Sequence, residues 1–251
     1  MSQPPHSSED LQKIYRNRFS GHLEYRSRVW QALTSRYFSR LIPPSATVLD
    51  LGCGYGEFIN NIRCSRKYAM DMNPSSREYL AKGVEFLEQD CSRPWALPDR
   101  HLDVVFTSNF FEHLPAKTVL ADTVAQAARC LKEGGLLIAM GPNARMVGGA
   151  YWDFWDHHLP LTDEALCELF RLHGFEIVFS APRFLPYTMV NQRPVPILLV
   201  SIYLRLPILW RFFGKQFLVV ARLTGRTAPA TEPAPGGTPA KNGVAFEERR
   251  D

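Results

Sequence analysis

Hydrophobic positions in the central part of the chain form short runs that alternate with segments of helical spacing. The short runs have the length of strands and end in polar or turn-forming residues; they occupy 46–51, 67–72, 84–88, 102–108, 135–141, 175–180 and 216–222. Segments 117–131 and 163–173 carry apolar residues three or four positions apart and are predicted helices, the first ended by Gly134-Gly135. This alternation predicts an α/β fold, in which a seven-stranded, mostly parallel sheet has helices on both faces.

The two ends of the chain differ from this central part. Apolar residues between Leu11 and Leu41 recur at spacings of three, four and seven, which predicts two amphipathic helices with a break near Ser20-Gly21. The first ten residues are polar and the last part is rich in Pro, Gly and Ala, so both are expected to be disordered. The chain is thus divided into a disordered N-terminus, an N-terminal helical cap, one domain and a disordered tail, with boundaries 1–10, 11–45, 46–223 and 224–251.

An apolar insertion, residues 194–213, lies before the last predicted strand. Its most hydrophobic part, 197–210, has 14 residues and would extend about 21 Å as a helix, whereas the hydrocarbon core of a bilayer is about 30 Å thick. We therefore do not expect it to span a membrane. Four roles remain open: packing in the core, lining an acceptor pocket, forming a homodimer, or contacting a membrane surface beside Arg205, Arg211 and Lys215.

Composition and charge narrow the function classes. The 29 basic and 25 acidic residues give a net charge of +4 and are interspersed along the chain, so no nucleic-acid partner is expected. Five cysteines without CxxC spacing are typical of reduced thiols, which predicts a cytoplasmic location and no metal site. The first residues lack the basic and apolar regions of a secretory signal.

The stretch VLDLGCGYGEF, residues 48–58, carries the clearest chemical signal. A strand ends in Asp50, and glycines then alternate with other residues, so that bare backbone lies at the carboxyl end of the strand, where ligands of such sheets bind. Dinucleotide sites favour G-x-G-x-x-G, but counted from Gly52 the third glycine position is Glu57, whose carboxylate would oppose a pyrophosphate.

The motif D-x-G-x-G-x-G resembles the first motif of the class I S-adenosylmethionine-dependent methyltransferases of the small-molecule type. The resemblance covers about residues 46–180 and extends to 222. It implies a Rossmann-like sheet whose last strand is antiparallel, with S-adenosylmethionine as the cofactor. The cofactor-binding residues that it implies follow the first four strands: Asp50, Gly52, Gly54, Gly56, Asp71, Met72, Asp90, Cys91, Asn109 and His113.

Two of these acids have more specific expected roles. Asp71 ends the second strand, 17 residues after Gly54, where a carboxylate can accept both ribose hydroxyls. The resemblance implies that Asp90 accepts a hydrogen bond from the adenine amino group. The alternatives are that Asp71 is a solvated turn residue and that Asp90 is an ordinary loop acid.

The acceptor is expected to meet the segment of about twenty residues between the fifth strand and helix 163–173. A proton-bearing acceptor benefits from a general base, and His157 and His158 are the candidates, with Asp153 or Asp156 to orient an imidazole. HHLPLT resembles a subset of small-molecule methyltransferases in which a histidine at this position faces the acceptor. The alternative is that one histidine caps the next helix. An aromatic wall is expected from Tyr151, Trp152, Phe154 and Trp155.

We therefore predict a methyltransferase that acts on a small-molecule, glycan or lipid-linked acceptor. Whether oxygen, nitrogen or carbon receives the methyl group is left open. The alternatives are an oxidoreductase with a nicotinamide cofactor, which Glu57 argues against, and a non-catalytic scaffold that retains the cofactor fold.

Overall fold

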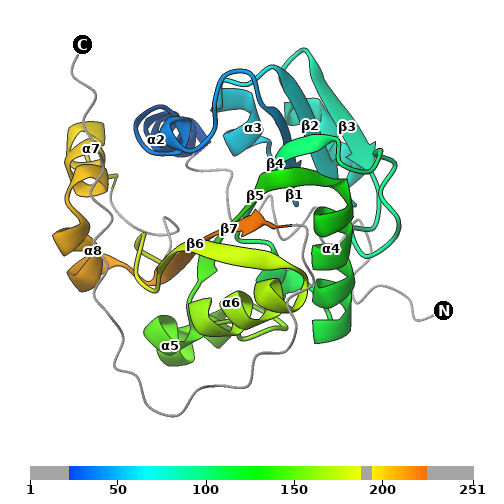
Figure 1. Cartoon of the computed structure of the whole chain (residues 1–251). Helices are drawn as coiled ribbons and strands as arrows, with labels where there is room; N and C mark the ends of the chain where they lie inside the picture. Colours follow the sequence, from blue (N-terminus) through cyan, green and yellow to red (C-terminus); the bar gives the residue numbers. More distant parts are fainter. Residues whose placement is uncertain (1–22, 188–193, 225–251) are drawn as a thin grey trace.

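The computed structural model describes residues 23–187 and 194–224, which form one mixed sheet with helices on both faces (Figure 1). All seven predicted strands are present. Their bounds are β1 Thr47–Leu51, β2 Arg66–Asp71, β3 Val84–Glu88, β4 Leu102–Ser108, β5 Leu131–Pro142, β6 Phe175–Ala181 and β7 Gln216–Leu223.

The strand order is β3-β2-β1-β4-β5-β7-β6. Strands β1 to β5 pair in parallel, whereas β7 is antiparallel to both β5 and β6. The predicted fold, a Rossmann-like sheet with an antiparallel last strand, is thereby confirmed. The strand order reverses between β1 and β4, and ligands of open α/β sheets bind beyond the carboxyl ends of the strands at such a point.

Two apolar cores lie on opposite faces of the sheet. On one face, α4 (Lys117–Cys130) and α6 (Asp163–Leu172) pack on Leu49 and Leu51. On the other, α2 (Leu23–Arg36) and α3 (Glu57–Asn61) pack on Val48, and the Phe58 and Phe106 rings stack with their centroids 3.6 Å apart. Alternate residues of β1 thus supply both cores, because successive side chains of a strand point to opposite faces.

The two helices predicted in the central part are α4 and α6. Thr162 caps α6 as expected, since its hydroxyl accepts the Ala165 N–H at 3.1 Å. The prediction that Gly134-Gly135 ends α4 is wrong. The helix ends at Cys130, and the two glycines lie within β5, which pairs from Leu131 onward through an irregular register opposite β4.

Short helical turns fill the connections. They are the 3₁₀ turns η1 (Phe38–Arg40), η2 (Pro74–Tyr79), η3 (Phe111–His113) and η4 (Gly148–Asp153), and the helix α5 (Ala144–Val147). The segment after β5, predicted without regular structure, therefore contains two short helical elements. The expected disorder of 1–10 and 225–251 and the first helix of the cap lie outside the described residues, whereas α2 corresponds to the second helix of the cap.

The apolar insertion before β7 forms two helices, α7 (Ile197–Arg205) and α8 (Pro207–Phe213). Leu206 lies between them, and Pro207 begins α8 at a position where its missing N–H costs nothing. Helix α7 packs against α2, on the face of the sheet that α2 covers (Figure 1). Within the described residues, none of the helices is long and apolar enough to reach across a membrane.

Candidate functional site

The turn after β1 depends on glycine for two reasons. Gly52 and Gly56 adopt positive φ angles of 69° and 67°, which L-residues with side chains rarely adopt. At Gly52 a Cβ atom would also lie 2.2 Å from Cγ of Phe110, and at Gly56 it would lie 2.6 Å from Cδ2 of Leu80. The backbone conformation therefore favours glycine at both positions, and at Gly52 the Phe110 ring also leaves no room for a side chain, whereas the Leu80 methyl group near Gly56 is the end of a flexible side chain.

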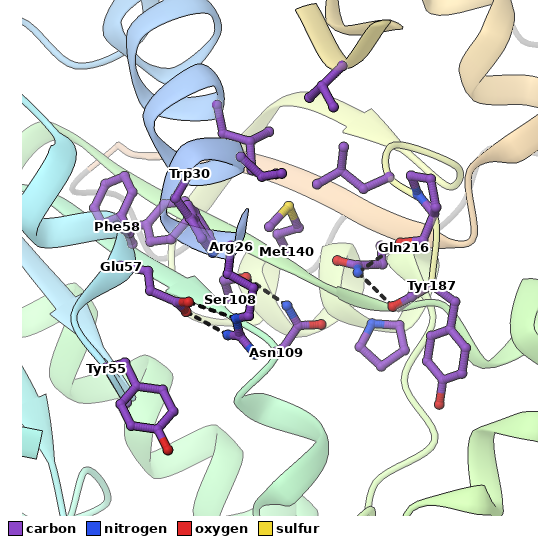
Figure 2. A pocket seen from close by; sticks show the side chains of 18 of the residues that line it. Arg26, Trp30, Tyr55, Glu57, Phe58, Ser108, Asn109, Met140, Tyr187 and Gln216 are labelled. Carbon is purple, nitrogen blue, oxygen red and sulfur yellow. Dashed lines mark hydrogen bonds and ion pairs between the residues drawn. The ribbon is translucent and has the colours of Figure 1, made fainter. Parts of the chain in front are cut away.

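A cavity of about 630 Å³ begins at this turn. One end is lined by the glycine turn, by α2 and by the ends of β4 and β5, where Figure 2 shows the rings of Trp30 and Phe58 beside Met140. The other end reaches the segment before α7 and side chains of α7 and α8. That second end is largely apolar, with Leu185, Pro186, Val195, Leu199, Val200, Ile202, Tyr203, Leu209 and Phe213.

Helix α2 is fixed to the glycine turn by an ion pair at the cavity wall. The Nε and Nη2 atoms of Arg26 donate to the Glu57 carboxylate at 2.7 and 2.6 Å (Figure 2). Both side chains are mostly buried and both line the cavity. Arg26 also compensates the negative charge of Glu57, which was expected to oppose a pyrophosphate. The remaining difference from dinucleotide sites is that Glu57 carries a side chain where those sites favour glycine.

Two carboxyls lie at the carboxyl ends of the central strands. Asp50 is buried in β1 and lines the cavity, and its burial raises its pKa to about 8 in spite of a hydrogen bond from the Ile59 N–H. Asp71 ends β2 and accepts the N–H groups of Gly54 and Asn73, each at 2.9 Å. Burial also raises the pKa of Asp71, while these hydrogen bonds lower it. The second strand tip thus holds the glycine turn in place.

The predicted cofactor residues divide between the cavity and the neighbouring strand ends. Those that line the cavity are Asp50, Gly52, Gly54, Asn109 and His113. Those outside its lining are Gly56, Asp71, Met72, Asp90 and Cys91. In this second group Asp90 accepts the Ser92 N–H and hydroxyl at 2.9 and 2.8 Å, and Cys91 is buried, with its sulfur accepting the Thr123 hydroxyl. Their roles toward the cofactor remain predictions.

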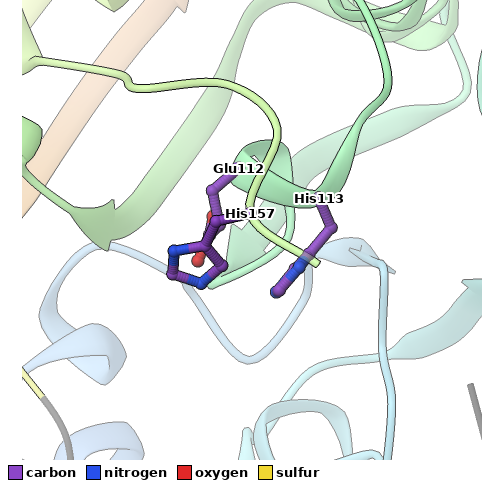
Figure 3. Close-up of side chains that lie close together, drawn as sticks. All are labelled: Glu112, His113 and His157. Atoms are coloured by element: carbon purple, nitrogen blue, oxygen red, sulfur yellow. The ribbon is translucent and has the colours of Figure 1, made fainter. Parts of the chain in front are cut away.

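Three polar side chains of the cavity lining lie close together. Figure 3 shows Glu112 and His113, from the turn after β4, beside His157 from the segment before α6. Nδ1 of His157 lies 2.9 Å from the Tyr151 carbonyl, and Nδ1 of His113 lies 2.9 Å from the Asp156 carbonyl. Because a carbonyl can only accept, each Nδ1 is the donor, and in a neutral ring Nε2 then carries the lone pair.

Electrostatics distinguish this cluster from an ordinary surface site. Asp156 is buried, and its carboxylate lies 3.3 Å from Nδ1 of His113. Glu112 is also buried, which raises its pKa to about 8, and the Asp156 charge adds to this rise. Ligand atoms of Glu112, His113 and His157 lie within 4.8 Å of one another, so these three side chains could hold a metal ion. The cysteine pattern of the sequence predicts no metal site, and this absence stays a prediction.

The structure separates the two predicted base candidates. His157 is buried and lines the cavity, whereas His158 is outside the lining and its backbone N–H donates to the Glu112 carbonyl. The predicted aromatic wall is wrong for Trp152 and Trp155, which are 59% and 81% exposed. Residues 148–153 wind through a 3₁₀ turn, so that neighbouring side chains point in different directions; Tyr151 is buried, and Phe154 lines the cavity.

Sequence reasoning missed Arg26 and Glu112. Glu112 lies in NFFEH after the fourth strand, between the predicted cofactor residues Asn109 and His113, so an acid there was a visible signal. Nothing in the spacing of α2 indicates that Arg26 pairs with a residue 31 positions away.

Comparison with known proteins identifies the family. The model of the methyltransferase domain family matches residues 22–179, which is more than half of the chain, so the chain belongs to this family. Its fold is that of the class I S-adenosylmethionine-dependent methyltransferases, and S-adenosylmethionine is the cofactor that the family implies.

The individual relatives are distant. The chain is 27% identical over 123 residues to 2-methyl-6-phytyl-1,4-hydroquinone methyltransferase of Synechocystis, a match that covers 46% of this chain and 38% of that protein. A methyltransferase structure from Archaeoglobus fulgidus superposes with a TM-score of 0.60 at 19% identity, covering 84% of this chain and 99% of the other. A chain in the complex of the Haloferax volcanii Trm112 methyltransferase activator and a methyltransferase gives 0.58 at 17%, covering 86% and 95%. These two structures support the fold alone.

Proposed function

We propose that this chain transfers a methyl group from S-adenosylmethionine to an acceptor that combines an apolar body with a proton-bearing polar group. The observation that carries this proposal is the cavity whose lining includes the glycine turn, the apolar side chains of α7 and α8, and the cluster of Glu112, His113 and His157. The bound cofactor supplies an electrophilic methyl group, and the protein binds and orients the two reactants.

The glycine turn and the adjacent carboxyls are suited to the cofactor. Its methionine part is cationic, and Asp50 at the cavity wall can compensate this charge by losing its proton when the cofactor binds. Asp71 keeps acceptor capacity beyond its two backbone hydrogen bonds and lies next to Gly54, where ribose hydroxyls can reach it. Asp90 and Cys91, which follow β3, are assigned to the adenine, and Met72, which follows β2, is also assigned to the cofactor.

His157 is proposed as the general base that takes the acceptor proton. Its ring is fixed by the Tyr151 carbonyl in the tautomer whose Nε2 can accept a proton, and it belongs to the lining of the cavity. His113, supported by Asp156 in the same way, is the second candidate, and it comes from the turn that also carries Glu112. His158, outside the lining, is not assigned a role in proton transfer.

An acceptor with a lipid-like part is favoured over a free sugar. The second end of the cavity is lined by aliphatic and aromatic side chains, which suit a hydrocarbon better than a hydroxylated ring. The hydroquinone named for the Synechocystis relative has the two parts that we propose, a polar ring and a phytyl chain. A lipid-linked glycan also combines a polar and an apolar part. The cytoplasmic location belongs to the proposal too, since all five cysteines are free thiols.

The test is a pair of measurements on the full chain. Titration with S-adenosylmethionine and with NADH should give binding of the first alone. Incubation with methyl-labelled cofactor and matched acceptors, phenols or sugars with and without an isoprenoid or acyl chain, should label the tailed acceptors faster. Binding of NADH alone would support the oxidoreductase instead. Cofactor binding without labelling of any acceptor would favour a scaffold.

A further inference from the structure

The outward face of the α7–α8 helix pair is apolar. Seven large apolar side chains there are exposed: Leu198, Leu199, Ile202, Leu206, Ile208, Phe212 and Phe213. We call these seven residues the α7–α8 face. Leu198 and Phe212 are 70% and 72% exposed, so most of each side chain is accessible to solvent. Isolated apolar residues on a surface are ordinary, whereas seven along two consecutive helices, mostly four positions apart, indicate an interaction site.

The inner sides of the two helices are already used for packing. Leu204 and Trp210 are buried in the core that also contains α2, and the Trp210 indole donates to the Tyr203 carbonyl at 2.9 Å. A helix on the surface of a globular protein normally presents polar residues outward, and a helix that is apolar all round is normally covered. Because α7 is apolar on both sides, its outward side is expected to meet an apolar partner.

The charges around the face indicate which partner. Residues 194–215 contain no acidic residue, and their three charged residues, Arg205, Arg211 and Lys215, are basic and exposed. Basic residues beside exposed leucines and phenylalanines are typical of segments that bind the interface of membranes with anionic lipids.

We propose that the α7–α8 face docks on an anionic lipid bilayer, with its leucines and phenylalanines in the interface and its basic residues at the headgroups. A second copy of the chain fits less well. A symmetric dimer through this face would use the same patch of both subunits, so Arg205, Arg211 and Lys215 would approach the same cations of the partner without an acid in the segment to compensate them.

The docked orientation would also open the cavity toward the bilayer. Leu199, Ile202 and Phe213 belong to the α7–α8 face and also line the cavity, so the cavity reaches the surface within this face. A lipid-like acceptor could then move from the bilayer to His157 without crossing water. This route rests on the proposed function, whereas the docking rests on the surface alone.

Vesicle flotation of the full chain without substrate tests the docking. The protein should float with vesicles of phosphatidylcholine and phosphatidylglycerol in equal parts, and much less with phosphatidylcholine alone. Leu198→Asp with Phe212→Asp should abolish flotation, and Arg205→Gln with Arg211→Gln should weaken it by about tenfold at physiological salt. The matched controls, Leu172→Asp on α6 and Lys82→Gln with Arg63→Gln, should float like the wild type.

Each outcome is decisive because folding and cofactor binding are measured on the same samples. None of the altered residues lines the cavity, so circular dichroism and S-adenosylmethionine affinity should remain those of the wild type. Failure of the wild type to float, equal flotation of the Leu198 and Phe212 variant, or a dimer by light scattering that this variant dissolves would overturn the proposal. If flotation holds but vesicles with an embedded acceptor are not methylated, the docking stands and the proposed function fails.

Discussion

Arg26 and Glu57 form a two-point ion pair that joins the N-terminal helix to the glycine turn, with N–O distances of 2.7 and 2.6 Å. The side chains of Arg26 and Glu57 are only 14% and 17% exposed to solvent. A carboxylate directly after the glycines is thus held by a cation from a different part of the chain. The pair fixes α2 over the cavity and orders the turn that is proposed to bind the cofactor.

Breaking this pair should destabilise the protein more than breaking an exposed one. We expect Arg26→Ala and Glu57→Ala each to lower the free energy of unfolding by about 2 kcal/mol, because each leaves a mostly buried charge without its counterpart. A double-mutant cycle by urea unfolding should give a coupling energy above about 1 kcal/mol.

The chain contains a matched control. Arg66 and Glu85 pair at 3.0 Å, but both are about half exposed, so their coupling energy should be below about 1 kcal/mol. Equal coupling in the two pairs would show that burial does not strengthen the Arg26–Glu57 pair. An unchanged cofactor affinity in Arg26→Ala would show that α2 is not needed to order the turn.

Asp71 should contribute to cofactor affinity through the ribose. Hydrogen bonds to a charged group contribute about 1.5–3 kcal/mol each, so Asp71→Ala should weaken binding of S-adenosylhomocysteine by roughly tenfold to a hundredfold. Because Asp71 also accepts the Gly54 N–H, a loss of affinity alone could come from a disordered turn.

An analogue that lacks a ribose hydroxyl separates these two effects. The wild type should bind the deoxy analogue more weakly than S-adenosylhomocysteine, whereas Asp71→Ala should bind both alike, as isothermal titration would show. The same discrimination by wild type and variant would mean that Asp71 supports the turn and does not contact the ribose.

Local signals were sufficient for the fold. Period-two and period-3.6 patterns are set by which face of an element is buried, so the strands and α4 and α6 could be found within a few residues. The end of α4 was missed because Gly134 and Gly135 lie within β5, whose early start depends on pairing with β4, a contact between distant segments.

The site was less accessible to sequence reasoning. Asp50 lies near the carboxyl end of β1 and the glycines follow that strand, so both could be placed by the rule for ligand sites of such sheets alone. Which of two adjacent histidines faces the cavity depends on the path of a short helical segment, and the pairing of Arg26 with Glu57 depends on where α2 packs. Neither the orientation of the histidines nor this pairing follows from the local spacing of apolar residues.

Asp50 and Glu112 should make the protein less stable as the pH rises. Burial raises the pKa of each to about 8, from ordinary values of 3.8 and 4.5. The folded state therefore holds these protons more tightly than the unfolded state. The resulting stabilisation is complete below the ordinary values and is lost between about pH 4 and pH 8.

The variant Asp50→Asn isolates this contribution because it cannot titrate. The difference in unfolding free energy between wild type and Asp50→Asn should change in favour of the variant as the pH rises from about 5 to 8. Bound S-adenosylmethionine, a cation, should favour the Asp50 carboxylate, so binding at neutral pH should release protons, measurable by calorimetry in buffers of different ionisation enthalpy. A pH-independent difference would show that Asp50 is already ionised in the folded protein.

Replacement of the adjacent histidines should have different effects on turnover. His157 lines the cavity and its Nδ1 donates to the Tyr151 carbonyl, so its Nε2 can take the acceptor proton. We expect His157→Ala to lower kcat by about a hundredfold to ten-thousandfold, the usual contribution of a general base, with little change in cofactor affinity. His158→Ala, outside the lining, should remain near the wild type and serves as the control.

The pH–rate profile distinguishes a base from a structural role. In the wild type kcat should rise with pH as His157 loses its proton, and this rise should be absent from the residual activity of His157→Ala. If His157→Ala keeps the rise of kcat with pH while His113→Ala and Asp156→Asn lose it, the base is His113. Nδ1 of His113 contacts both the carbonyl and the carboxylate of Asp156. Near-normal rates in all of these variants would mean that the acceptor loses its proton without help from a histidine.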